Sequence, residues 1–370
     1  MATAEQTVKQ LLALADIQIG GNRPFDIKIN DPKFYSHVLA GGSLALGESY
    51  MDGWWDCRAL DEFFHKIIRA KLDKKVKGRM TLQVLKAKIL NLQSKAKAYE
   101  VGEHHYDLDN DLYRRMLDKR MTYSCGYWKN AKTLDDAQEA KLDLICRKLG
   151  LKPGMKVLDI GCGWGSFIRY AAEKYGVTSV GVTVSKEQAA LAKDTCKSLP
   201  IEIRLADYRT LNETFDHVVS VGMFEHVGYK NYREFMKVAH RCLKPHGLLL
   251  LHTIGGNTSK HFGDPWVDRY IFPNGMLPSV RQIADSSEGL FVLEDWHNFS
   301  VDYDTTLLQW HKNFVNAWGE IKHAYNKRFY RMWTYYLLSF AGSFRARKNQ
   351  LWQVVLSKDG VEGGYDRIRP

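Results

Sequence analysis

Residues 157–165, VLDIGCGWG, combine an acidic side chain with three glycines at a spacing that suits a cofactor. Apolar positions lead through Asp159 into Gly161, Gly163 and Gly165, which is the pattern of a buried strand that ends in a tight turn. Glycine at such a turn permits positive φ and lets a ligand approach the main chain closely. The spacing differs from G-x-G-x-x-G and from G-x-x-x-x-G-K-S/T, so neither a dinucleotide pyrophosphate nor nucleotide phosphates are indicated. A strand–turn–helix unit without a ligand is the alternative at this point.

Other side chains that could do chemistry follow apolar segments elsewhere in the chain. Glu225 and His226 come directly after HVVSVGM, and His252 lies in LLLLHTI. Cys125 lies in MTYSCGYW, and Tyr303 lies in VDYDTT. A lone buried histidine is more often a core residue than a catalyst, and a cysteine among aromatics is usually a small hydrophobe. Glu225 resists that interpretation, because a carboxylate in a Phe-Met-Val neighbourhood must be paired or must shift its pKa.

Alternating strand and helix patterns predict the scaffold that positions these residues. Apolar strands are expected at 156–160, 179–184, 201–207, 217–223, 248–254 and 352–357. Helices are expected at 135–149, 166–175, 186–198 and 232–242. This alternation predicts a Rossmann-like α/β domain, with a mostly parallel sheet and helices on both faces. Right-handed crossovers then bring the loops after the strands to one sheet edge, where ligands bind.

The chain is expected to divide into three parts. They are a small N-terminal α/β domain at 1–70, a basic helical connector at 71–103 and the large domain at 104–370. The N-terminal part is expected to hold a helix at 7–15, a strand at 25–30 and a helix at 60–69. Its aromatics, among them Tyr50, Trp54 and Trp55, suggest docking to lipid or to a second subunit. An aromatic-rich insertion at 258–347 interrupts the large domain, and some of its rings are expected to line an apolar cavity.

The composition indicates a globular protein without a membrane span or a metal site. No apolar run approaches about 18 residues, the length that a transmembrane helix needs. The start, MATAEQTVKQLLALA, lacks a basic stretch followed by a long apolar core, so no signal peptide is expected. The six cysteines are scattered without a C-x-x-C pair, which argues against a zinc site and a disulfide framework. A reduced, cytoplasmic setting fits this pattern.

The net charge of +11 is concentrated in one segment of the chain. Residues 66–97 contain eleven Lys or Arg and a single acid, Asp73. Apolar residues alternate with these charges, which favours a basic amphipathic helix on an anionic membrane surface. A solvated helix without a partner is the alternative, and no nucleic-acid motif accompanies the charge.

Several motifs together resemble one family of enzymes. The D-x-G-x-G-x-G form is similar to the first motif of the S-adenosylmethionine-dependent methyltransferases. MTYSCGYW, VLDIGCGWGSF, GVTVSKEQ, VGMFEHVG, LLHTIG, DPWVDRYIFPNGMLPS and WHNFSVDYDTTL, in this order, resemble the bacterial cyclopropane-fatty-acyl-phospholipid synthases. GESYMDGWWDC and EHHYDLDNDLY extend the resemblance over essentially the whole chain. In such enzymes a methyl group passes from S-adenosylmethionine to a cis double bond of an acyl chain, and proton loss closes a cyclopropane ring.

The resemblance implies two sets of site residues. A bicarbonate ion would accept the proton, held by main-chain groups of Cys125 and Ile254 and by the side chains of Glu225, His252 and Tyr303. Cys125 is interpreted as a structural residue, because a thiolate would attack the carbocation intermediate. The expected contacts of S-adenosylmethionine are Tyr123, Ser124, Asp159, Gly161, Gly163, Gly165, Thr183, Gln188, Asp207 and Tyr208. Thr183 and Gln188 stand where many methyltransferases place an acid for the ribose.

The resemblance also implies partners and a location. We expect a phospholipid membrane surface as the partner, contacted through segment 66–97 at the inner face, together with a homodimer and no nucleic acid. Two other functions are weighed against this one. The first is a methyltransferase of the same fold that acts on an amine, or on an alkene without ring closure. The second is a lipid-binding or regulatory protein without catalysis.

Overall fold

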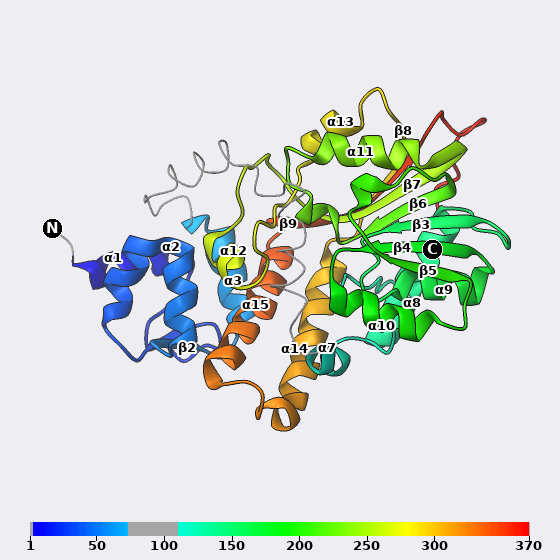
Figure 1. Cartoon of the computed structure of the whole chain (residues 1–370). Helices are drawn as coiled ribbons and strands as arrows, with labels where there is room; N and C mark the ends of the chain where they lie inside the picture. The colour runs from blue at the N-terminus through cyan, green and yellow to red at the C-terminus, as the bar shows by residue number, and fades with distance from the viewer. Residues whose placement is uncertain (1–2, 73–109, 370) are drawn as a thin grey trace.

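The computed structural model describes residues 3–72 and 110–369. Most of the basic segment 66–97 and the start of the large domain lie outside these residues. A seven-stranded sheet with strand order β5-β4-β3-β6-β7-β9-β8 dominates the described part (Figure 1). Its strands are β3 (Lys156–Ile160), β4 (Thr178–Thr183), β5 (Ile201–Leu205), β6 (Phe215–Val221), β7 (Leu243–Gly256), β8 (Val292–Asn298) and β9 (Asn349–Ser357).

Strands β3 to β7 run parallel, while β9 pairs antiparallel with both β7 and β8. The predicted Rossmann-like fold with a mostly parallel sheet is therefore confirmed. The order reverses between β3 and β6, so the loops after these two strands open a crevice at the carboxyl edge. Strand β8 lies inside the segment that the sequence analysis treated as an insertion, so part of that segment belongs to the sheet.

Helices cover both faces of the sheet, because successive strand residues point to opposite faces. In β3, Val157 packs with one face and Leu158 with the other. The first face carries α8 (Leu134–Lys148), α9 (Ser166–Tyr175) and α10 (Lys186–Cys196). The second face carries α11 (Tyr232–Arg241) and α13 (Val280–Ser287).

A second layer of helices joins the sheet to the N-terminal elements (Figure 1). It consists of α7 (Asn110–Met116), α12 (Pro265–Tyr270), α14 (Val301–Ile321) and α15 (Lys327–Arg345). The N-terminal elements are α1 (Ala4–Ala13), β1 (Ile27–Ile29), α2 (Lys33–Met51), β2 (Trp55–Cys57) and α3 (Leu60–Arg69). No helix in these described ranges is both long and apolar enough to cross a membrane.

Packing is continuous between the N-terminal elements and the helical layer. Tyr50 and Phe64 both pack their rings against Tyr335 of α15. Gly342 of α15 approaches the main chain of α3 so closely that a Cβ atom there would lie 2.3 Å from the carbonyl oxygen of Asp61. Tyr50 is buried in this core, and so is Trp55, which is fully enclosed. These two aromatics therefore cannot be the docking surface that the sequence suggested.

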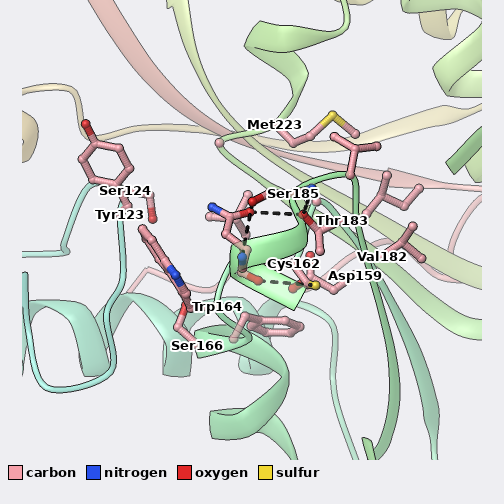
Figure 2. Close-up of a pocket in the computed structure, with 18 of the residues that line it drawn as sticks. Tyr123, Ser124, Asp159, Cys162, Trp164, Ser166, Val182, Thr183, Ser185 and Met223 are labelled. Atoms are coloured by element: carbon pink, nitrogen blue, oxygen red, sulfur yellow. Dashed lines mark hydrogen bonds between the residues drawn. The ribbon is translucent and has the colours of Figure 1, made fainter. Parts of the chain in front are cut away.

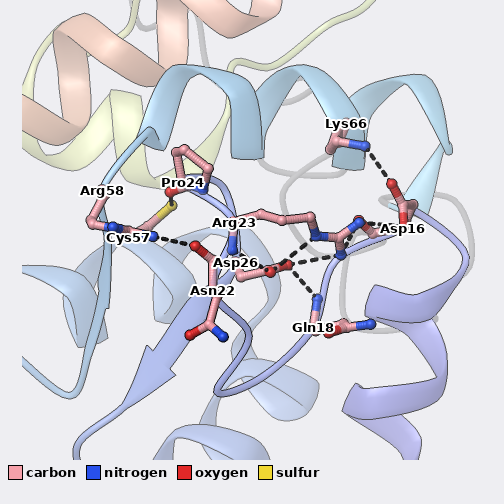
Figure 3. Close-up of polar contacts among 9 residues, drawn as sticks. All are labelled: Asp16, Gln18, Asn22, Arg23, Pro24, Asp26, Cys57, Arg58 and Lys66. Atoms are coloured by element: carbon pink, nitrogen blue, oxygen red, sulfur yellow. Dashed lines mark hydrogen bonds and ion pairs between the residues drawn. The ribbon is translucent and has the colours of Figure 1, made fainter.

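Polar contacts hold the loop before β1 against α3 (Figure 3). The guanidinium of Arg23 donates to Asp26 at 3.0 Å and to Asp16 at 2.7 Å. Hydrogen bonding from Arg23 lowers the pKa of Asp26 to about 2. Lys66, the first cation of the basic segment, donates to Asp16 at 2.9 Å and lies over the Phe25 ring. Lys66 is therefore engaged within the fold.

Candidate functional site

The glycine turn after β3 adopts backbone angles that favour glycine. The φ angles of Gly161, Gly163 and Gly165 are +89°, +54° and +81°. The main-chain N–H groups of Gly161 and Cys162 both donate to the carbonyl of Val182 in β4, at 2.9 and 3.0 Å. A Cβ atom on Gly161 would lie 2.5 Å from the Met223 side chain. The turn is thus fixed to the sheet and packed against the loop after β6.

A pocket of about 160 Å³ opens at this turn, at the carboxyl edge of the sheet (Figure 2). In this view Tyr123, Ser124 and Trp164 lie on one side, and Thr183 and Met223 lie on the other. The structure brings nine of the ten residues expected at the cofactor to the wall of this pocket: Tyr123, Ser124, Asp159, Gly161, Gly163, Thr183, Gln188, Asp207 and Tyr208.

Gly165 is the expected cofactor residue that does not line the pocket. It precedes α9 as its N-cap, and a Cβ atom there would lie 3.1 Å from the Cys196 sulfur. The structure therefore gives Gly165 a role in the turn, because its left-handed backbone and the nearby α10 leave little room for a side chain.

Polar side chains after β4 and β5 are held in place around the pocket. The Thr183 hydroxyl donates to Gln188 Oε1 at 3.1 Å, and Ser185 caps α10 by accepting from the Gln188 main chain. The Arg209 guanidinium donates to the Asp207 carboxylate from Nε at 2.9 and 3.1 Å and from Nη2 at 2.6 Å. The sequence therefore placed Thr183 and Gln188 together correctly, while it gave no indication of Arg209.

Helix α8 positions the segment that carries Tyr123 and Ser124. Gln138 Nε2 donates to the Ser124 carbonyl at 2.7 Å, and Lys141 Nζ donates to the Ser124 hydroxyl at 2.8 Å. Both side chains on α8 are fully buried. Lys141 also lines the pocket, although no motif in the sequence singles it out. A lysine in an amphipathic helix is normally expected on the face that contacts solvent, so the sequence did not predict that Lys141 is buried.

Burial opposes the charges of two groups in the pocket wall. It raises the pKa of Asp159 to about 7, although the nearby Lys141 acts in the opposite direction. It lowers the pKa of Lys141 to about 8, although Asp118, Cys125 and Asp159 favour the charged ammonium. Such shifts arise where charged groups lie in a low-dielectric site, and they are common at functional sites.

Glu225 is not among the residues that line this pocket, but it stands in the chain between Met223 and His226, which both line it. Its element is the 3-10 turn η3 (Phe224–His226), which follows β6. The main-chain N–H of Ile254 donates to Glu225 Oε1 at 2.6 Å. Oε2 is buried and has no hydrogen-bond partner among the described residues. Burial raises the pKa of Glu225 to about 7, so its carboxyl can carry a proton near neutrality.

His252 lies two residues before Ile254 on β7, so both side chains point to the same face of the sheet. Its Nδ1 lies 3.3 Å from Gln353 Nε2, while its Nε2 is buried without a partner in the described part of the chain. With Gln353 Nε2 as the donor, the imidazole proton sits on Nε2. Burial holds the pKa of His252 well below its usual range, and Lys141 and Lys148 act in the same direction. The imidazole is therefore neutral.

Cys125 lies near the start of α14, the helix that carries Tyr303. The Cys125 sulfur lies 3.9 Å from the Thr306 hydroxyl, one helical turn from Tyr303. Tyr303 packs its ring against Trp310 and Phe344. Burial raises the pKa of Cys125 well above its usual range, so the thiol stays protonated. Glu225 is thus hydrogen-bonded to the main chain of Ile254, and Cys125 lies beside the helix that carries Tyr303. That these residues bind one anion together stays a prediction.

Two further residues of the pocket wall went unassigned in the sequence analysis. Trp164 stands inside the glycine turn and donates from Nε1 to Asn110 at 3.0 Å. His226 was noted only as the neighbour of Glu225. The only feature of the sequence that points to Trp164 and His226 is their position inside the motifs VLDIGCGWG and VGMFEHVG. Across residues 3–72 and 110–369, no three His, Cys, Asp or Glu side chains are grouped to hold a metal ion.

Comparisons with known proteins agree with this geometry. A sequence model of the family described as mycolic acid cyclopropane synthetase matches residues 93–354. The cyclopropane-fatty-acyl-phospholipid synthase of Escherichia coli strain K12 is 57% identical over 357 residues, which cover 96% of this chain and 93% of that protein. The cyclopropane mycolic acid synthase MmaA2 of Mycobacterium tuberculosis strain H37Rv is 36% identical over 279 residues, or 70% of this chain and 97% of that protein.

Solved structures show the same relationship. The structure of MmaA2 superposes with a TM-score of 0.67 at 34% identity and covers 73% of this chain and 100% of its own. CmaA1 in complex with SAH and CTAB superposes with a TM-score of 0.66 at 34% identity, over 70% of this chain and 98% of its own. Coclaurine N-methyltransferase reaches a TM-score of 0.69 over 85% of this chain and 99% of its own, but at 21% identity it shares the fold alone.

The family expected from the motifs is thereby confirmed. The sheet, the glycine turn and the match over nearly the whole chain lead to one assignment. The chain belongs to the mycolic acid cyclopropane synthetase family of S-adenosylmethionine-dependent enzymes, together with the cyclopropane-fatty-acyl-phospholipid synthases.

Proposed function

We propose that this enzyme transfers the methyl group of S-adenosylmethionine to a cis double bond in an acyl chain of a membrane phospholipid and then closes a cyclopropane ring. The observation that carries the proposal is the buried carboxyl of Glu225, with its free Oε2, beside the pocket at the glycine turn. Ring closure needs a base next to the methyl donor, and a buried carboxyl that can donate from Oε2 would hold a small anion as that base. Methylation of an amine needs no such anion site.

The pocket suits S-adenosylmethionine in charge and in shape. Gly161 and Gly163 leave the main chain open where the amino-acid end of the cofactor would lie. Thr183, Gln188 and Asp207 offer polar groups for the ribose and the adenine. In the reaction the bond from sulfur to the methyl carbon breaks, and the π electrons of the alkene form the new carbon–carbon bond. The carbocation that results then loses a proton from the transferred methyl, and those electrons close the ring.

A cluster of aromatic rings extends from Tyr123 in the pocket wall, where we expect the cation to form. Tyr123 packs against Trp310, and its hydroxyl lies 2.9 Å from that of Tyr336. Phe272 packs against Tyr336 in turn. Such rings exclude water, and their π faces stabilise a nearby cation without supplying a nucleophile.

The groups around Glu225 fit a bound bicarbonate ion. His252 offers an Nε2–H, and a protonated Glu225 offers an O–H at Oε2; both atoms are buried and lack partners in the described residues. We infer that these two groups, with Tyr303 and the main chain at Cys125 and Ile254, hold the ion. When bound, bicarbonate would supply the base for the proton lost at ring closure. The surrounding residues orient the ion and keep water away.

Association with the membrane is part of the proposal. The expected contact is the basic segment 66–97, and charge of this density attracts anionic lipid headgroups. We further propose that the enzyme works as a homodimer at the inner, cytoplasmic face of the membrane. The likeness to the E. coli phospholipid enzyme over 96% of the chain supports a phospholipid substrate.

The test is product analysis on vesicles. The purified protein is incubated with S-adenosylmethionine, bicarbonate and vesicles that contain anionic and monounsaturated phospholipids. We expect a mass gain of one CH₂ unit per converted chain together with loss of the alkene signal. A methylated chain that keeps its double bond, or a methylated amine headgroup, would overturn the proposal. Vesicles of saturated lipid serve as the control and should give no product.

A further inference from the structure

We propose that Lys141 forms, with the Ser124 hydroxyl, the subsite that binds the carboxylate of the cofactor's amino-acid end. This inference rests on the proposed use of S-adenosylmethionine. Lys141 lies near the middle of α8 with no exposed surface, and it borders the same pocket as the glycine turn.

The contacts of Lys141 leave its ammonium with donors to spare. Nζ donates to the Ser124 hydroxyl at 2.8 Å, and in the described part of the chain no other acceptor lies within hydrogen-bond distance. An ammonium carries three N–H donors, and a buried charge without sufficient partners is unfavourable. Asp118 favours the charged ammonium through its electrostatic influence, but in the described part of the chain no hydrogen bond or ion pair joins it to Lys141. An anionic ligand in the pocket would complete the shell.

Asp159 supplies the complementary group in the same pocket. Its side chain is buried, and its Oδ1 has no hydrogen-bond partner among the described residues. Lys141 and Asp159 interact electrostatically, yet they do not form an ion pair with each other. A ligand with an ammonium and a carboxylate on one carbon would satisfy both, since Asp159 accepts from the ammonium and Lys141 donates to the carboxylate. The cofactor's amino-acid end has this composition.

A merely structural role for Lys141 makes a different prediction. Through Ser124, Lys141 also fixes the segment that carries Tyr123, which lines the pocket elsewhere. If this positioning were its only role, its loss would weaken every ligand of the pocket. If Lys141 binds the carboxylate, only ligands that carry a carboxylate would lose affinity.

The experiment compares two ligands on two variants by isothermal titration calorimetry. S-adenosylhomocysteine has the amino-acid end, whereas 5′-methylthioadenosine has the same nucleoside and thioether without it. For Lys141→Met we expect the affinity for S-adenosylhomocysteine to fall by about tenfold or more, because a charged hydrogen bond is lost. The affinity for 5′-methylthioadenosine should stay within about twofold of the wild type, because this ligand never contacts Lys141.

Lys148→Met is the matched control, because Lys148 is a buried lysine on the same helix outside the pocket. Lys148 Nζ lies 3.6 Å from the Asp295 carboxylate, which also forms an ion pair with Arg369. Asp295 therefore keeps a cationic partner when Lys148 is replaced. We expect it to change neither affinity, and thermal unfolding of each variant verifies its fold.

The outcomes separate this inference from the proposed function. An equal loss for both ligands, or no loss for either, would overturn the role of Lys141 while the wild type still binds the cofactor product. Failure of the wild type to bind S-adenosylhomocysteine would instead overturn the proposed function.

Discussion

Burial determines the protonation of the residues that would carry the reaction. Glu225, Asp159 and Lys141 all lie out of solvent, and each has its pKa moved toward neutrality, where the uncharged form becomes accessible. Charged carboxylates could not share a small pocket edge with a bound anion. A protonated Glu225 donates to that anion, so the same burial that disfavours the charge prepares the site.

The first prediction concerns Glu225→Gln. This change keeps the shape of the side chain but replaces the carboxylic O–H at Oε2, which would donate to the bicarbonate, with a weaker amide N–H donor. We expect ring formation on vesicles to fall by about tenfold or more, because the ion that accepts the proton is then held less firmly. The affinity for S-adenosylhomocysteine should be unchanged, because Glu225 lies beside the pocket wall. Lipid mass spectrometry and calorimetry measure the two quantities, and full ring formation by the variant would exclude the assigned role.

The second prediction is a pH dependence of stability. The pKa of Glu225 rises from 4.5 in the unfolded chain to about 7 in the fold. The folded state therefore holds the proton more tightly, and the stability contribution is complete below pH 4.5 and is lost as the pH rises through 7. Between about pH 5.5 and about pH 8, the free energy of unfolding of the wild type should fall about 2 kcal/mol more than that of Glu225→Gln.

Denaturant titration of both proteins at the two pH values measures this difference. Asp159 also titrates near 7, but it is present in both proteins, so the comparison isolates Glu225. Parallel pH profiles for the two proteins would show that Glu225 does not hold the proton.

At this scale the sequence could identify residues that lie inside motifs or directly after strands. Gly161, Gly163, Thr183 and Glu225 were predicted in this way, because the carboxyl ends of parallel strands share one edge. The first three line the pocket, and the roles of all four stay predictions. Lys141 was not found, because its helix precedes the motif and only the folded chain shows that it is buried. Gly165 was assigned to the cofactor because spacing does not tell a turn glycine from one that faces a ligand.

At the scale of elements, the turn between β3 and α9 must be made of glycine at Gly161. A Cβ atom there meets Met223 at 2.5 Å, and the φ angle of +89° is unfavourable for other residues. For Gly161→Ala we expect the free energy of unfolding to fall by about 1–3 kcal/mol and cofactor affinity to fall with it, since the turn and Met223 must shift.

Gly319→Ala is the matched control for this prediction. Gly319 lies in α14, where a Cβ atom would meet nothing within 4 Å. Because alanine favours a helix, this variant should gain about 0.5–1 kcal/mol and keep its affinity. Denaturant titration and calorimetry compare the two variants. Equal effects on affinity would mean that the fit at Gly161 is not what holds the cofactor.

Element prediction succeeded where the apolar period was strong. Strands β3, β4 and β6 are buried on both faces and are almost continuously apolar in sequence. Helix α2 was not predicted, because glycines such as Gly47 disfavour a helix. The structure requires glycine at this position, since a Cβ atom on Gly47 would lie 2.2 Å from the indole ring of Trp266. Strand β8 was also missed, because it lies at the sheet edge and its Val292 and Leu293 are exposed.

At the scale of the whole molecule, the charge distribution predicts how the enzyme reaches its substrate. Reversal of Lys74, Lys75 and Lys77 to Glu should weaken binding to anionic vesicles by about tenfold or more, since each cation contributes about 1 kcal/mol near such a surface. These residues lie outside the described ranges, so the prediction rests on the sequence. Vesicle sedimentation at several salt concentrations measures it.

A charge-matched control tests whether position matters. Reversal of Lys152, Lys193 and Lys197, which are exposed on the sheet domain, changes the net charge by the same amount. This control should reduce vesicle binding much less than reversal in the basic segment. Equal losses would mean that net charge alone, and not the segment, draws the protein to lipid.

The close approach of Gly342 to α3 has a consequence for exchanging parts between relatives. At Gly342 the main chains of α15 and α3 are in direct contact, so a larger side chain at this position would displace the N-terminal elements from α15. A chimera that joins residues 3–72 to another member's catalytic part should therefore fold only where that partner keeps an equally small residue here. We expect one heat-absorption peak for the intact protein and two for Gly342→Leu, because the N-terminal elements would then melt separately.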